Sequence, residues 1–221
     1  MVYDASAKAS PESPSLYECL YAGPTLNNKL WEVLVRARSF PVAITGDIQK
    51  AFLQIRVRES ERDSLRFHWR PNPQADVEVL RFTRLLFGLV SSPFLLGGVL
   101  ETHLDHWKSK APDAVEALRR CLYVDDIISG GCTVEEARKR KLEAIDILGD
   151  ATFTLHKWAS NAKESDEGSV NKNHEEQTAA KQQFGVQPTE TKILGTTWNK
   201  EKDTYMYIKD IVGNCQRSAT F

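Results

Sequence analysis

The sequence predicts an α+β domain with a mostly antiparallel sheet and helices on one face. Two observations predict it: apolar alternating segments typical of strands, and amphipathic segments that begin at helix caps. Their order is strand, strand pair, helix, acidic hairpin, helix, strand, which favours this class over a doubly wound fold. With 221 residues, 41% of them hydrophobic, the chain can bury the core of one large domain.

The individual elements follow from local signals. After an irregular start, helices are expected at residues 25–38, 91–108, 114–120 and 133–150. Pro93 suits a first helical turn and Thr133 suits an N-cap. Strands are expected at residues 42–57, 65–69, 77–82 and 153–158, with a terminal hairpin within 193–207. Residues 70–73, Arg-Pro-Asn-Pro, form the expected turn between the paired strands.

Two adjacent carboxylates, Asp125 and Asp126, interrupt an apolar segment and are followed by Ser129, Gly130 and Gly131. The glycine pair is typical of a hairpin turn, so the acids are expected at or near the hairpin tip. Like charges about 4 Å apart repel by roughly 4 kcal/mol at an effective dielectric of 20, and a divalent cation would compensate them. The alternative is ordinary turn chemistry, in which Asp is common.

A third carboxylate, Asp47, ends an apolar strand about eighty residues before the pair. Three carboxylates on neighbouring strands would form a cup of hard oxygen ligands, which favours Mg²⁺ or Mn²⁺. Two such ions could serve phosphoryl chemistry. For Asp47 alone, a turn residue at a strand end is an equal alternative.

Composition limits the classes of function. With 29 basic and 30 acidic residues the net charge is −1, which argues against a free-standing nucleic-acid binder held by bulk charge. The cysteines show no CxxC pairing, so ordinary thiols in a reducing compartment are expected. We find no membrane-length apolar stretch and no apolar leader, and therefore expect a soluble intracellular protein. A charged stretch at residues 162–183 is expected to be an exposed loop or weak helix.

Five segments resemble, in order and spacing, the palm motifs of reverse transcriptases. They are Asp47–Ile55, Phe82–Phe94, Tyr123–Asp126, Leu155–Asn161 and Ile193–Asn199. The residues of these segments are most similar to those of the BEL/Pao long-terminal-repeat retrotransposons, and Val2–Lys8 resembles their fingers segment. The resemblance covers nearly the whole chain.

The resemblance implies an RNA-directed DNA polymerase that adds dNTPs to a primer 3′-hydroxyl. It implies that Asp47 and Asp125 hold two Mg²⁺ ions, for which Mn²⁺ can substitute, with Asp126 as the third carboxylate. The implied dNTP contacts are Ile48, Phe52, Phe87, Gly88 and Lys157. The implied primer or template contacts are Tyr123, Val124, Leu194 and Gly195. Its partners would be RNA template, DNA or RNA primer, dNTPs and the rest of a polyprotein, in a cytoplasmic retroelement particle and without a membrane.

Several of these residues have plainer alternatives. Phe52 falls where the family keeps an aromatic ring that excludes a ribose 2′-hydroxyl, but it could be simple core. Lys157 could neutralise the pyrophosphate or be a solvated lysine. Tyr123 could touch the primer end or merely pack on the sheet. Ser91 and Ser92 could be helix caps.

The resemblance divides the chain into four parts: partial fingers at 1–40, palm at 41–160, a charged loop or insertion at 161–190, and a primer-grip-like hairpin at 191–221. The family's triphosphate-gripping arginine would lie one residue before Met1, and the thumb, connection and ribonuclease H would follow Phe221. We therefore expect a palm cut from a larger polyprotein, or a decayed copy. The alternatives are a catalytically silent structural module and an RNA-dependent RNA polymerase.

Overall fold

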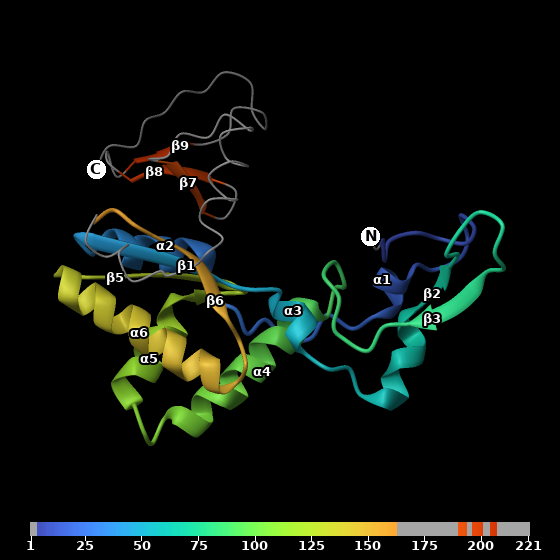
Figure 1. Ribbon diagram of the computed structural model, residues 1–221, viewed down its shortest axis with the longest axis horizontal. Helices are drawn as coiled ribbons and strands as arrows, with labels where there is room; N and C mark the ends of the chain where they lie inside the picture. The colour runs from blue at the N-terminus through green and yellow to red at the C-terminus, as the bar shows by residue number, and fades with distance from the viewer. Residues whose placement is uncertain (1–3, 163–189, 194–195, 201–203, 207–221) are drawn as a thin grey trace.

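The centre of the molecule is a four-stranded antiparallel sheet. The computed structural model describes residues 4–162, 190–193, 196–200 and 204–206. The strand order is β4-β5-β1-β6 (Figure 1). The strands are β1 (Val42–Ile48), β4 (Leu122–Tyr123), β5 (Asp126–Gly131) and β6 (Leu155–Ser160). The α+β class with an antiparallel sheet is thus confirmed.

Helices cover both faces of this sheet, whereas the sequence predicted one. Ile127 belongs to the core cluster with helices α5 (Pro112–Cys121) and α6 (Val134–Asp150). Its neighbour Ile128 belongs to a second cluster with α2 (Leu30–Arg38). Because adjacent strand residues point to opposite faces, α2 packs on the face opposite α5 and α6.

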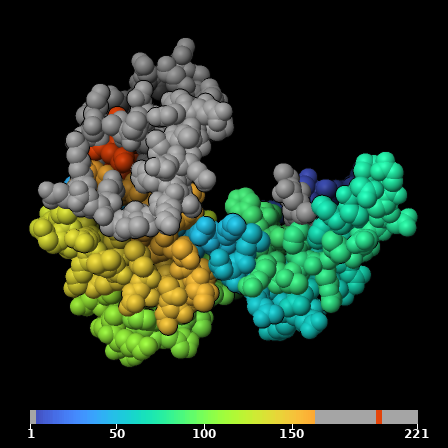
Figure 2. Space-filling view, viewed as in Figure 1, coloured from blue at the N-terminus to red at the C-terminus, as the bar shows by residue number. Residues whose placement is uncertain are grey.

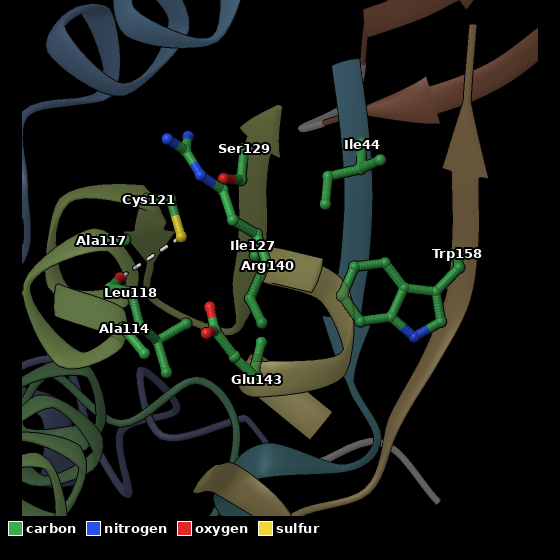
Figure 3. Close-up of a pocket in the computed structure, with 11 residues that line it drawn as sticks. Ile44, Ala114, Ala117, Leu118, Cys121, Ile127, Ser129, Arg140, Glu143 and Trp158 are labelled. Carbon is green, nitrogen blue, oxygen red and sulfur yellow. Dashed lines mark hydrogen bonds between the residues drawn. The ribbon is translucent and has the colours of Figure 1, made fainter. Parts of the chain in front are cut away.

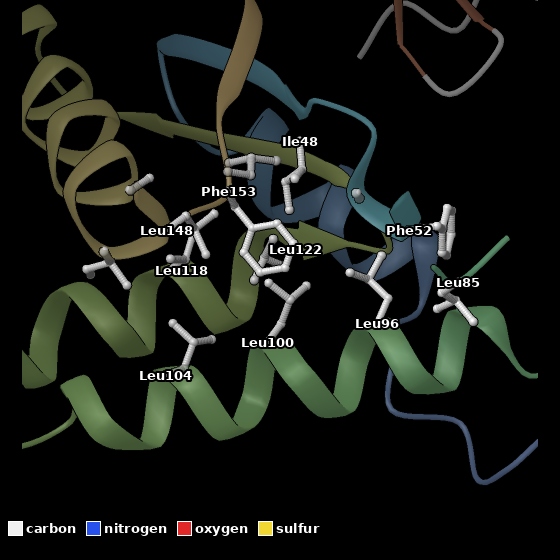
Figure 4. Packing of buried hydrophobic residues seen from close by; sticks show 14 of the residues in the cluster. Ile48, Phe52, Leu85, Leu96, Leu100, Leu104, Leu118, Leu122, Leu148 and Phe153 are labelled. Atoms are coloured by element: carbon white, nitrogen blue, oxygen red, sulfur yellow. The ribbon is translucent and has the colours of Figure 1, made fainter. Parts of the chain in front are cut away.

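The larger core lies between the sheet, α5, α6 and the long helix α4 (Ser92–Trp107). Helix α4 presents Leu96, Leu100 and Leu104 to it, at the spacing of one helical face (Figure 4). Fully burying one such side chain stabilises the fold by about 1.5–3 kcal/mol. This packing fixes the sheet that carries the acidic residues.

A second lobe extends from the sheet through α3 (Ala51–Gln54) and the 3₁₀ segment Glu59–Leu65. Its strands β2 (Arg66–Trp69) and β3 (Glu78–Arg81) pair as predicted around the Arg-Pro-Asn-Pro turn. The short helix α1 (Leu16–Cys19) belongs to the same part of the molecule (Figure 1). The surface is hollowed between this lobe and the lobe that contains the sheet (Figure 2).

The hairpin turn is not where the glycine pair predicted it. Gly130 and Gly131 lie inside β5 and pair with Ala43 and Val42 of β1. A Cβ at Gly130 would collide with the Val42 carbonyl, so this glycine serves a close strand approach rather than a turn. The turn is formed by Val124 and Asp125, which places the acidic pair at the tip by a different route.

Three other local predictions are wrong at their boundaries. The strand predicted to residue 57 ends at Ile48, because the chain turns at Lys50 (φ 51°) and enters α3. The helix predicted from Thr25 begins at Leu30 with Lys29 as its N-cap. Residues 1–24 are not wholly irregular, since Ser15 and Glu18 form a capping box that starts α1. The helices predicted at 91–108, 114–120 and 133–150 are confirmed, the last with Thr133 as its N-cap.

The C-terminal hairpin is confirmed and extended by a third strand. Strands β7 (Glu190–Ile193), β8 (Thr196–Asn199) and β9 (Thr204–Met206) form an antiparallel sheet. Trp198 of β8 is fully buried in the cluster that includes Val33 and Ile128. Residues 163–189, with most of the charged stretch, and the primer contacts Leu194 and Gly195 lie outside the described residues. In the parts that are described, no helix has the length and apolarity to cross a membrane.

Candidate active site

Folding brings the three predicted carboxylates together at one end of the sheet. Asp47, near the end of β1, is the direct antiparallel partner of Asp126, the first residue of β5. Asp125 lies in the adjacent turn, and its carbonyl accepts a hydrogen bond from the Ile48 amide at 2.8 Å. Tyr123, the last residue of β4, pairs with Asp126 from the other side. Strand pairing thus holds Asp47 and Asp126, and the Ile48 amide fixes the turn that carries Asp125.

The carboxylates lie on the α2 face of the sheet, away from α5 and α6. Ile127 and Ile48 point into the α5–α6 core, so Asp126 and Asp47, one position earlier in each strand, point to the opposite face. All three acids are half-buried. Part of each of these side chains is therefore exposed.

Burial and mutual repulsion disfavour the charged forms of the acidic pair. Burial, followed by the charges of Asp125 and Asp47, raises the pKa of Asp126 from 3.8 to about 6. Burial is also the main cause of the raised pKa of Asp125, and Asp47 adds to it. Lys157 opposes both shifts. The site thus carries unbalanced negative potential that a cation would relieve.

The turn that carries the acids is strained. Val124 has φ 56°, in the left-handed region. For a β-branched residue this conformation is an outlier, and such outliers cost of order 1–3 kcal/mol. Val124 joins two strands through a two-residue turn, and the pairing of Tyr123 with Asp126 holds it there.

Lys157 and His156 contact the same carboxylate oxygen. The Lys157 Nζ donates to Oδ2 of Asp47 at 2.6 Å, and the His156 Nε2 lies 3.4 Å from that oxygen. Burial lowers the pKa of His156, while the Asp47 charge opposes this effect. Lys157, which the resemblance to reverse transcriptases assigns to the nucleotide, therefore lies against Asp47 in the structure. His156 was not singled out from the sequence, where only its position beside Lys157 could have suggested a role.

Phe52 and Phe87 form an aromatic contact in α3 and the loop before α4. Phe52 is 7% exposed and belongs to the main core, whereas Phe87 is 78% exposed. Their ring centroids are 5.7 Å apart with a 68° interplanar angle. Gly88 follows with φ 88°, a conformation that suits glycine. Phe52 is thus a core residue, and its ring contacts the exposed ring of Phe87.

Three other residues considered from the sequence, Ile48, Tyr123 and Ser92, are buried or half-buried. The Ile48 side chain is 1% exposed in the main core, so only its backbone lies at the site. Tyr123 is half-buried against the cluster beneath α2. Ser92 is buried, and its hydroxyl donates to the Leu86 carbonyl at 2.6 Å, which anchors the loop that carries Phe87.

The donor set fits a hard divalent ion. Three carboxylates offer oxygen ligands, and Mg²⁺ commonly uses one or two of these while water and substrate phosphates complete its shell. Within the described part of the chain, no three His, Cys, Asp or Glu side chains are grouped to hold a metal by themselves.

A small cavity lies on the opposite face of the sheet, and none of the three carboxylates lines it. It lies between Ile44, Ile127 and Trp158 of the sheet and residues of α5 and α6 (Figure 3). Burial raises the pKa of the Cys121 thiol beside it to about 12, which disfavours the thiolate form. No known protein family and no curated protein matches this chain.

Proposed function

We propose that this chain is the palm of an RNA-directed DNA polymerase of the BEL/Pao type. The observation that carries the proposal is the pairing of Asp47 with Asp126, two strand-end acids from distant segments, with Asp125 in the adjoining turn. A polymerase needs such a cluster of hard oxygen donors on an open face. The order of five palm-like segments supports the same function.

In this proposal Asp47 and Asp125 hold two Mg²⁺ ions. When bound, these ions would activate the primer hydroxyl and neutralise the departing pyrophosphate. Asp126 contributes a third carboxylate. Burial and the charges of Asp125 and Asp47 raise its pKa, and added positive charge would relieve this repulsion. Backbone pairing of β1, β4 and β5 holds the acids in position before substrate arrives.

The neighbouring side chains suit a nucleotide. Phe52, backed by the core and touching Phe87, supplies a rigid wall that can exclude a ribose 2′-hydroxyl. Gly88 permits close backbone approach at the exposed turn. Lys157, on the edge strand β6, is near enough to these acids to meet the triphosphate.

The proposal is tested by extension of a DNA primer on an RNA template with Mg²⁺ or Mn²⁺. We expect extension by the wild-type chain and its loss in Asp125→Asn/Asp126→Asn. Asp146→Asn removes a carboxylate from the exposed side of α6 and serves as the matched control. Extension only with ribonucleotides would assign an RNA polymerase instead. If the chain extends no primer and binds neither metal nor primer-template, it is a silent module.

A further inference from the structure

A β-bulge aims Lys157 at the acidic site. Between two regular pairs of β1 and β6, the single residue Gly46 stands opposite both Lys157 and Trp158. Lys157 is the extra residue of the bulge and has a left-handed backbone, with φ 52°. The Trp158 ring lies directly over Gly46. Bulges redirect side chains in this way. In a regular strand Lys157 and His156 would point to opposite faces, yet both contact Asp47.

The contact between Lys157 and Asp47 is a charged one to a single oxygen. The ammonium is 2.6 Å from Oδ2 of Asp47, whose side chain is only 24% exposed. His156 occupies the other approach to that oxygen at 3.4 Å. One oxygen of the carboxylate that a metal ion would use therefore already has a cation against it.

A metal ion and this ammonium compete for the same carboxylate. Mg²⁺ binds a carboxylate oxygen at about 2.0–2.1 Å, so an ammonium in contact with that oxygen would repel it at close range. We propose that Lys157 is the resident counter-ion of Asp47 and that a divalent cation binds this carboxylate only by displacing it. Lys157 then swings from Asp47 toward bulk solvent, where its side chain is already 57% exposed.

This inference rests on the proposed function, because it gives Lys157 two successive partners. Before metal binds, Lys157 neutralises Asp47. After displacement, the same ammonium is available to the triphosphate of the incoming nucleotide. Metal binding at Asp47 would thus release the Lys157 ammonium to bind phosphate.

The test measures binding of Mn²⁺ alone, by the electron paramagnetic resonance signal of the free ion, with no nucleotide or primer. Lys157→Met removes the charge, and Lys157→Arg retains it. Lys50→Met is the matched control, because Lys50 lies three residues after Asp47 and also has a left-handed backbone. Asp125→Asn/Asp126→Asn identifies binding at this site.

We expect Lys157→Met to bind Mn²⁺ at least about fivefold more tightly than wild type, the effect of one unit charge at contact distance in water. Lys157→Arg and Lys50→Met should stay near wild type. Equal or weaker binding by Lys157→Met, with binding still lost in the double Asn variant, would overturn the counter-ion role and leave the polymerase proposal standing. If no variant binds Mn²⁺, the counter-ion role fails, and primer extension decides the polymerase proposal separately.

Discussion

The amide of Ile48 donates to the carbonyl of Asp125 at 2.8 Å, one residue beyond the pairing of Asp47 with Asp126. This bond attaches the hairpin tip to the end of β1. On the other side of β1, the Gln49 amide donates to the Thr154 carbonyl at 2.8 Å. The strand end that carries Asp47 is therefore clamped between the acidic turn and the start of β6, and the spacing of the acids is set before any ligand binds.

The raised pKa of Asp126 predicts a pH-dependent stability. Its folded-state pKa of about 6 exceeds the ordinary 3.8, so the folded state holds the proton more tightly. The free energy of unfolding therefore falls as pH rises from about 4 to about 6. Asp126→Asn should match wild type at low pH and exceed it by about 1 kcal/mol at pH 7, a value discounted for solvent screening.

This prediction is checked by urea unfolding at several pH values in the presence of a chelator. Asp146→Asn, on the exposed side of α6, should show no such divergence. If wild type is as stable as Asp126→Asn at pH 7, then ionisation of Asp126 does not lower the free energy of unfolding, and the prediction is wrong.

Replacement of Val124 by glycine should stabilise the chain. Glycine adopts φ 56° without the steric cost that Val124 bears, although it loses more backbone entropy on folding. We expect a net gain of about 0.5–1 kcal/mol, measured as a higher urea midpoint at unchanged m-value. Val134→Gly, at the first position of α6, is the control and should destabilise. Equal losses in both variants would contradict strain at the turn.

Gly46→Ala should destabilise the sheet. An added Cβ would lie 2.9 Å from Cε3 of Trp158, and the ring would have to move. Such overpacking costs about 1–3 kcal/mol. In Gly149→Ala the added Cβ meets nothing within 4 Å, and this α6 position should gain about 0.5–1 kcal/mol. Thermal unfolding of the two variants should therefore shift in opposite directions, and shifts of the same sign would argue against close packing at the bulge.

Phe52→Val should weaken the choice of deoxynucleotides over ribonucleotides by at least about tenfold, because a smaller side chain leaves room for the 2′-hydroxyl. Phe153→Val is the matched control, since Phe153 is 4% exposed in the same core cluster. Both variants should lose stability, but only the first should change the ratio of kcat/KM for dNTP and rNTP. An unchanged ratio would leave Phe52 as a core residue alone.

The local sequence determined most elements of this protein and identified its acids. Pro93 and Thr133 begin helices α4 and α6 where predicted, because helix starts depend on a few neighbouring residues. The paired strands β2 and β3 follow from a short turn between alternating segments. The acids Asp47, Asp125 and Asp126 were identified because charges are unusual beside apolar strands.

Only the tertiary structure decided how these parts meet. Gly130 has the local signature of a turn, yet it lies in a strand because Val42 of β1 passes too close for a side chain. The bulge at Lys157 depends on a partner strand about 110 residues away, so no local period reveals that Lys157 and His156 share one oxygen. Contacts between distant segments depend on strand pairing and packing, which act only once the chain has folded, and these place the cation of Lys157 on the acid of Asp47.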